Sequence, residues 1–173
     1  MSEFALVEVA GRRVGAVEDF ARSALFDRTF KDGMSLVEDA AAYLDGSGRQ
    51  ESRLLSRSGA LAYANISMRL TTQLMQVASW LLVQRAVREG DMPALEACDD
   101  RYRVTAPPEL DLSAEFDGEA CALPEGLLNL LDRSRQLYER VRHLDQRMYR
   151  DEMDVSPHPL QSQMDRLRAA FGG

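Results

Sequence analysis

Residues 62–87 read AYANISMRLTTQLMQVASWLLVQRAV, and their apolar side chains form two separate stripes along a helix. One stripe repeats every seven residues, whereas the other recurs at steps of three and four residues on a different flank. The first consists of Leu54, Leu61, Met68, Met75 and Leu82, and the second of Tyr63, Ile66, Leu70, Leu74, Val77 and Leu81. A helix that is apolar on two sides needs a cover on both. We therefore expect a long helix over 51–89 that has one side in its own bundle and the other against a second copy of the chain.

Either stripe of this helix could face the second copy. We assign the dimer interface to the second stripe, from Tyr63 to Leu81, and the seven-residue stripe remains the alternative. Small polar residues stand four positions after members of the seven-residue stripe, and they would let another helix approach closely: Ser58, Asn65, Thr72 and Ser79. Trp80 is in the middle of the helix, where a tryptophan is usually part of the core.

Two further helices complete the predicted bundle. In 22–45, apolar residues fall on one face, namely Phe26, Phe30, Met34, Val37, Ala41 and Leu44. In 123–150, a heptad stripe comprises Leu127, Leu130, Ser134, Leu137, Val141, Leu144 and Met148. Gly33 costs its helix about 1 kcal/mol relative to alanine, so we expect either a closely approaching backbone or a bend there. The sequence thus predicts an all-α fold, an antiparallel three-helix bundle that forms a two-fold dimer.

The negative charge of the chain is concentrated between the second and third helices. The 173 residues carry 28 Asp and Glu against 21 Lys and Arg, a net charge of −7. Residues 91–126 alone hold ten acids and two bases, so the other 137 residues hold 18 acids and 19 bases, a net charge of +1. Such a balance provides no broad attraction to nucleic acid or to anionic membranes. We expect a long acidic connection over 91–123, and loops of that length are either functional or disordered.

The ends of the chain lie outside the predicted bundle. We divide the chain into an N-terminal extension (1–20), the bundle domain (21–150) and a flexible C-terminal tail (151–173). In the tail, Met164, Leu167 and Phe171 have roughly helical spacing, which predicts a tethered partner-binding peptide.

No constellation that would support catalysis is visible. The sequence has no glycine-rich phosphate loop, nucleophile elbow or zinc-protease motif. His143 has no serine or cysteine partner at a readable spacing, and Cys98 and Cys121 are too far apart to resemble a zinc-binding pair. We therefore expect a non-enzymatic protein with no catalytic residues, no metal and no cofactor. The absence of a secretion signal and of a membrane-spanning stretch predicts a cytoplasmic location.

Three arginines recur every seven residues beside the apolar stripe of the third helix. They are Arg133, Arg140 and Arg147. One interpretation is pairing with acids of a neighbouring helix, such as Glu38 or Asp39. The other is a partner-binding strip for an acidic protein or for the acidic connection itself, and the sequence leaves both open.

Three stretches of the sequence resemble one known family. They are FKDGMSLVEDAAAYLDGSGR (30–49), the helix quoted above with the following Arg-Glu-Gly (62–90), and DRSRQLYERVRHLD (132–145). Long and idiosyncratic, they closely resemble the signature helices of the regulator-of-CtrA-degradation family.

This resemblance implies a dimeric three-helix bundle and a non-enzymatic adaptor. In that family the adaptor helps deliver cell-cycle regulators to the ClpXP protease at the cell pole. The resemblance also implies a single-domain response regulator and a cyclic-di-GMP-responsive effector as partners. A purely structural helical dimer with no role in delivery is the alternative.

Overall fold

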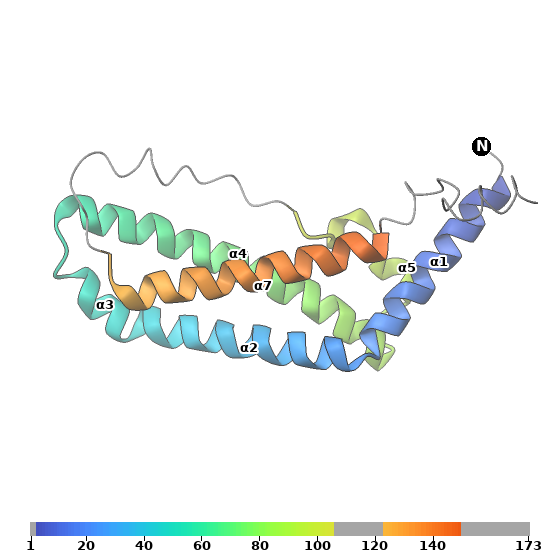
Figure 1. Ribbon diagram of the computed structural model, residues 1–173, viewed down its shortest axis with the longest axis horizontal. Helices are drawn as coiled ribbons and strands as arrows, with labels where there is room; N and C mark the ends of the chain where they lie inside the picture. Colours follow the sequence, from blue (N-terminus) through green and yellow to red (C-terminus); the bar gives the residue numbers. More distant parts are fainter. Residues whose placement is uncertain (1–2, 106–122, 150–173) are drawn as a thin grey trace, which may run out of the picture.

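The computed structural model describes residues 3–105 and 123–149, and every regular element in these ranges is helical. The elements are α1 (Glu3–Ala21), α2 (Ala24–Asp45), α3 (Ser47–Ser52), α4 (Arg57–Glu89), α5 (Ala94–Ala97), η1 (Asp100–Tyr102) and α7 (Glu125–Tyr149). The helices α2, α4 and α7 lie side by side along their length, and α1 leaves one end of this group at an angle (Figure 1). For the described residues, the prediction of an all-α fold is confirmed.

Serine caps define where two of the long helices begin. Phe26 N donates a hydrogen bond to Ser23 Oγ at 3.1 Å at the start of α2, and Gly59 N donates to Ser56 Oγ at 3.2 Å at the start of α4. Such caps satisfy amide groups that have no partner inside the helix. Because Ser56 begins a new helix, the single helix predicted over 51–89 is wrong at its start, and α3 is a separate turn of chain.

The core contains the flank of α4 that the sequence predicts as the dimer interface. Its residues are at most 9% exposed within a single chain: Tyr63, Ile66, Leu70, Leu74, Val77 and Leu81. They belong to one apolar cluster with residues of α2 and α7. The assignment of this flank to a dimer interface is therefore wrong, because its side chains are already covered by the chain's own helices. Trp80, 2% exposed, is a core residue as expected.

The helices α4 and α7 run in the same direction. Trp80 Nε1 donates a hydrogen bond to Asp145 Oδ1 at 3.0 Å. Nearer the start of both helices, Ser134 Oγ donates to Gln73 Oε1 at 3.0 Å. Between these two contacts the residue number rises in both helices, from Gln73 to Trp80 in α4 and from Ser134 to Asp145 in α7, as in a parallel pair. The predicted antiparallel arrangement holds for α2 against the other two helices but not for α4 against α7, because α7 begins at Glu125, at the end of the bundle where α4 also begins.

Close approach explains the glycine inside α2. A Cβ atom at Gly33 would lie 2.6 Å from Leu81 Cδ1 of α4 and 3.8 Å from Leu137 Cδ2 of α7. The Leu137 distance is an ordinary contact, but the end of the Leu81 side chain would have to move to make room for a Cβ. Of the two explanations that the sequence left open, close approach is confirmed.

A second close approach joins the corner after α2 to the start of α7. The ring of Tyr43 lies between Gly48 of α3 and Gly126 of α7: a Cβ at Gly48 would lie 2.5 Å from Cε1 of the ring, and a Cβ at Gly126 would lie 2.5 Å from Cε2. The Tyr43 hydroxyl donates a hydrogen bond to Glu51 Oε2 at 2.7 Å. Burial and the neighbouring carboxylate both raise the pKa of Tyr43.

The N-terminal extension is a helix, which the sequence analysis did not predict. Val17 and Ala21 of α1 are fully buried. The ring of Phe20 lies 5.5 Å from the ring of Trp80 and 5.8 Å from that of Phe26. The last turns of α1 thus cover the end of the core at which α2 begins and α4 ends.

Candidate interaction surface

The stripe whose apolar residues recur every seven positions, from Leu54 just before α4 to Leu82 within it, is exposed to solvent. The exposed fractions of its side chains are 87% for Leu54, 63% for Leu61, 70% for Met68, 64% for Met75 and 51% for Leu82. The small polar residues that we noted beside it, Ser58, Asn65, Thr72 and Ser79, are also exposed. Single exposed apolar residues are ordinary, but a continuous row of them marks a surface that another molecule covers. We give the name α4 outer face to the eight of these residues that lie on α4, which leaves out Leu54 in the turn before the helix.

The α4 outer face is uncharged. Between Arg57 and Arg85, the only charged residue of the helix is Arg69, which is half-buried at the margin. The Thr72 hydroxyl donates a hydrogen bond to Met68 O at 2.9 Å, within the same helix. Its polar group therefore already has a partner, and covering it would cost little desolvation.

The geometry of the α4 outer face is that of a helix-pairing seam. From Leu61 to Leu82 the large residues alternate with the small polar ones at steps of four and three, as in the two core positions of a heptad. From Leu61 to Leu82 the helix rises by about 32 Å. Small side chains in one of the two positions allow a second helix to lie close.

Two of the three arginines on α7 pair with α2. Arg133 Nη2 lies 2.8 Å from Asp39 Oδ2, and Arg140 Nη1 lies 3.1 Å from Asp32 Oδ2. The pair between Arg133 and Asp39 agrees with the first of the two interpretations, pairing with an acid of a neighbouring helix. Both pairs are about half exposed, so each contributes at most about 1 kcal/mol. Arg147 is exposed and has no ion pair with another described residue. Binding of an acidic partner to this strip stays a prediction.

A buried carboxylate ties the start of the acidic connection to the bundle. Asp145 is 2% exposed and accepts hydrogen bonds from Trp80 Nε1 and, at 3.4 Å, from Arg103 Nη2. Tyr138 Oη donates to Thr105 O at 2.6 Å. Burial raises the pKa of Asp145, and the bonds from Trp80 and Arg103 oppose that rise. This network was not predicted from the sequence, although Asp145 lies three and four residues from Met148 and Val141, on an apolar face.

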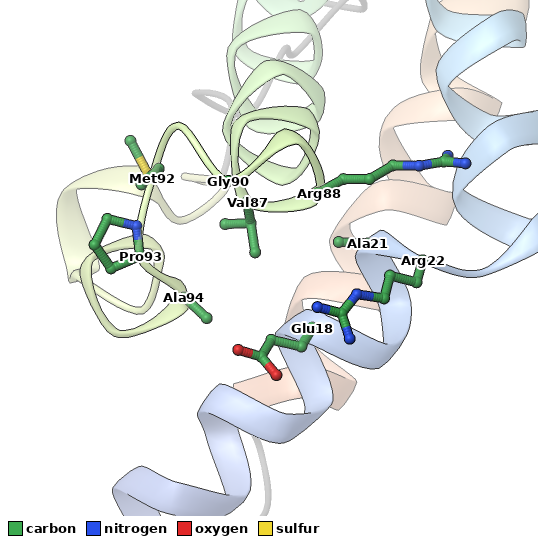
Figure 2. A pocket seen from close by; sticks show the side chains of 9 residues that line it. All are labelled: Glu18, Ala21, Arg22, Val87, Arg88, Gly90, Met92, Pro93 and Ala94. Carbon is green, nitrogen blue, oxygen red and sulfur yellow. The ribbon is translucent and has the colours of Figure 1, made fainter.

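Figure 2 shows a cleft of about 270 Å³ between α1 and the turn that follows α4. It is lined by Glu18, Ala21, Arg22, Val87, Arg88, Gly90, Met92, Pro93 and Ala94. The Arg88 side chain extends away from the cleft toward α2, where it forms an ion pair with Asp27. No serine, cysteine or histidine lines this cleft, so it holds no nucleophile with a general base.

Metal-binding and reactive side chains are equally sparse in residues 3–105 and 123–149. No group of three or more His, Cys, Asp or Glu side chains in these ranges could hold a metal ion. His143 is exposed on α7, and burial raises the pKa of the Cys98 thiol. None of the helices described here is both long and apolar enough to cross a membrane. The predicted tail residues Met164, Leu167 and Phe171, like residues 106–122 of the acidic connection, lie outside the described residues.

Fold and surface together define a helical protein whose most distinctive feature is an exposed, uncharged helix face suited to protein contacts. A family model described as "Protein of unknown function (DUF1465)" matches residues 17–171, and the chain belongs to this family. The crystal structure of RcdA from Caulobacter crescentus CB15 is 58% identical in sequence, covers 78% of this chain and 99% of its own, and has a TM-score of 0.61. The predicted family resemblance is confirmed. Among curated proteins, none matches the chain significantly.

Proposed function

We propose that this protein is a non-enzymatic adaptor that helps deliver cell-cycle regulators of the response-regulator type to the ClpXP protease. The observation that carries the proposal is the 58% identity to RcdA over 99% of that chain. An exposed face suited to protein contacts agrees with such a role. A response regulator and a cyclic-di-GMP-responsive effector are the proposed partners, and the cell pole is the proposed site of action.

The working form in this proposal is a two-fold dimer joined through the α4 outer face. A two-fold interface uses the same patch on both copies, so the patch has to be complementary to itself. An uncharged row of Leu and Met separated by small residues meets this condition, because no like charges are brought together. Burial of apolar area then provides the stabilising free energy.

The adaptor role is tested by reconstitution. ClpXP, the response-regulator partner and a fluorescent substrate are mixed with and without this protein, and substrate loss is followed. Faster turnover that requires the protein supports the proposal, whereas an unchanged rate contradicts it. Pull-down from an extract distinguishes the adaptor from the alternative, since a purely structural dimer should retrieve neither protease nor response regulator.

The dimer is tested separately by sedimentation. Leu61→Asp places a charge in the α4 outer face and should weaken association by a factor of ten or more, about 1.4 kcal/mol or above. Leu95→Asp is the matched control, because Leu95 of α5 is 66% exposed, close to the 63% of Leu61, and lies on another element. Self-association that Leu61→Asp leaves as strong as Leu95→Asp does would contradict a dimer joined through this face without touching the adaptor role.

A further inference from the structure

The α4 outer face has a second possible occupant within the same chain. Residues 160–171 read LQSQMDRLRAAF, and their apolar side chains follow steps of four, three and four. These are Leu160, Met164, Leu167 and Phe171. The α4 outer face uses the same steps, since Leu61, Asn65, Met68, Thr72 and Met75 are four or three residues apart. We propose that residues 160–171 dock in cis, as an amphipathic helix, on the C-terminal half of the α4 outer face.

The direction of α7 makes this docking geometrically accessible. Because α4 and α7 are parallel and Trp80 contacts Asp145, the chain leaves α7 at Tyr149 near the level of Leu82. The ten residues 150–159 can span about 33 Å when extended. The outer side of α4 is about 20 Å from α7, taking an interaxial distance of 8–10 Å and a helix diameter of 10–12 Å. The linker is therefore long enough.

The lengths of the two surfaces also correspond. A helix over 160–171 rises by about 18 Å, which equals the length of α4 from Thr71 to Leu82. If the segment runs antiparallel to α4, Leu160 lies near Leu82 and Leu167 lies near Met75. Met68 lies beyond the end of the segment and stays exposed.

Charge favours this orientation of the segment. The α4 outer face is uncharged, so it has to receive the apolar side of a partner. In residues 160–171 the charged residues, Asp165, Arg166 and Arg168, fall outside the apolar stripe, so the proposed docking would leave them in water. The match to the family model continues through residue 171, so the segment belongs to the part of the chain that the family shares.

The consequence is a competition for one surface, and this part rests on the proposed dimer. A segment tethered through ten residues has an effective concentration of the order of millimolar. A second copy of the chain at micromolar concentration is therefore at a disadvantage of up to about a thousandfold if the two contacts are equally strong. Docking in cis would keep the chain monomeric until a partner withdraws the tail.

Methionine oxidation measures the docking directly. Met68 and Met75 are 70% and 64% exposed in the described structure, so they serve as matched reporters. The full chain is treated with dilute peroxide at submicromolar concentration, and each sulfoxide is followed by mass spectrometry. We expect Met75 to react at least about threefold more slowly than Met68, and Leu167→Asp with Phe171→Asp to abolish the difference. Ser162→Asp, on the polar side of the segment, is the matched control and should preserve it.

Every other outcome contradicts one named part of the proposal: the docking, its cis arrangement or the dimer. Equal oxidation of Met68 and Met75 in the full chain at dilution overturns docking. Protection of both methionines that appears only at high concentration and survives the tail substitutions overturns docking while supporting the dimer. Protection that needs both high concentration and an intact tail shows docking on a second copy, which overturns the cis arrangement. Protection of Met75 at dilution, together with a double variant that stays monomeric at every concentration, supports docking and contradicts the dimer.

Discussion

Substitution of Gly126 by alanine tests how tightly the end of the bundle is built. The new Cβ would lie 2.5 Å from Tyr43 Cε2 and 3.0 Å from Cζ, and the other edge of the ring already faces Gly48. The ring cannot withdraw without straining that contact or the hydrogen bond to Glu51. Overpacking of this kind costs about 1–3 kcal/mol, and the gain in helix propensity returns at most about 1 kcal/mol. We expect a net loss of about 1–2 kcal/mol.

Thermal and urea unfolding measure this loss. For a chain of this size, 1 kcal/mol shifts Tm by about 2–4 °C, so Gly126→Ala should lower Tm by about 2–8 °C. All variants are compared at one protein concentration, because self-association would add to the apparent stability. Gly11→Ala is the matched control: nothing lies within 4 Å of a Cβ at that position, so the variant should be neutral or slightly stabilised.

A double-mutant cycle identifies the cause. In a Tyr43→Ala background the ring is absent, so Gly126→Ala should cost nothing further or become slightly favourable. The coupling energy between the two sites should then be at least about 1 kcal/mol. The reasoning is refuted if Gly126→Ala is as stable as the unsubstituted chain, or if its cost is the same with and without the Tyr43 ring.

Two other predictions concern charged side chains. Burial raises the pKa of Asp145, so its stabilising contribution is present below the unfolded pKa of about 3.9 and is lost as pH rises through the folded pKa. As pH rises from 4 to 7, the free energy of unfolding of Asp145→Asn, measured in urea, should therefore increase relative to that of the unsubstituted chain. A difference between the two proteins that does not change with pH would count against this. Arg133→Ala and Arg140→Ala should each cost at most about 1 kcal/mol, because their pairs are half exposed. A loss above about 3 kcal/mol in either would show that the pair is not a simple surface contact.

The periodicity of the sequence predicted the long helices better than it predicted their faces. Both stripes of α4 are apolar, and a single sequence does not say which one the chain itself covers. The buried flank is the broader one, with steps of three and four residues and with Trp80 beside it. The exposed stripe is narrow and alternates with Ser, Asn and Thr. Breadth and the identity of the intervening residues, rather than apolar content, would have distinguished the two.

Other features depended on contacts between distant parts of the chain. Gly11 and Gly15 lowered the helical signal of α1, and the buried residues Val17 and Ala21 stabilise this helix through tertiary contacts. The direction of α7 could not be predicted, because a connection as long as 90–124 can return to either end of the bundle. The roles of Gly48 and Gly126 became visible only once Tyr43 was placed between them.

The parallel arrangement of α4 and α7 also has a consequence for the time course of folding. The helices α2 and α4 are joined by a short segment, so they can pair early, whereas the residues of α2 and α4 that bond to α7 are 61 to 108 positions away from their partners. Contacts of such long range form slowly, because a large loop has to close first. While the chain is synthesised, the groove between α2 and α4 is therefore complete before the helix that fills it exists. Until α7 emerges from the ribosome, the nascent chain carries an open apolar groove and depends on slow closure or on a chaperone.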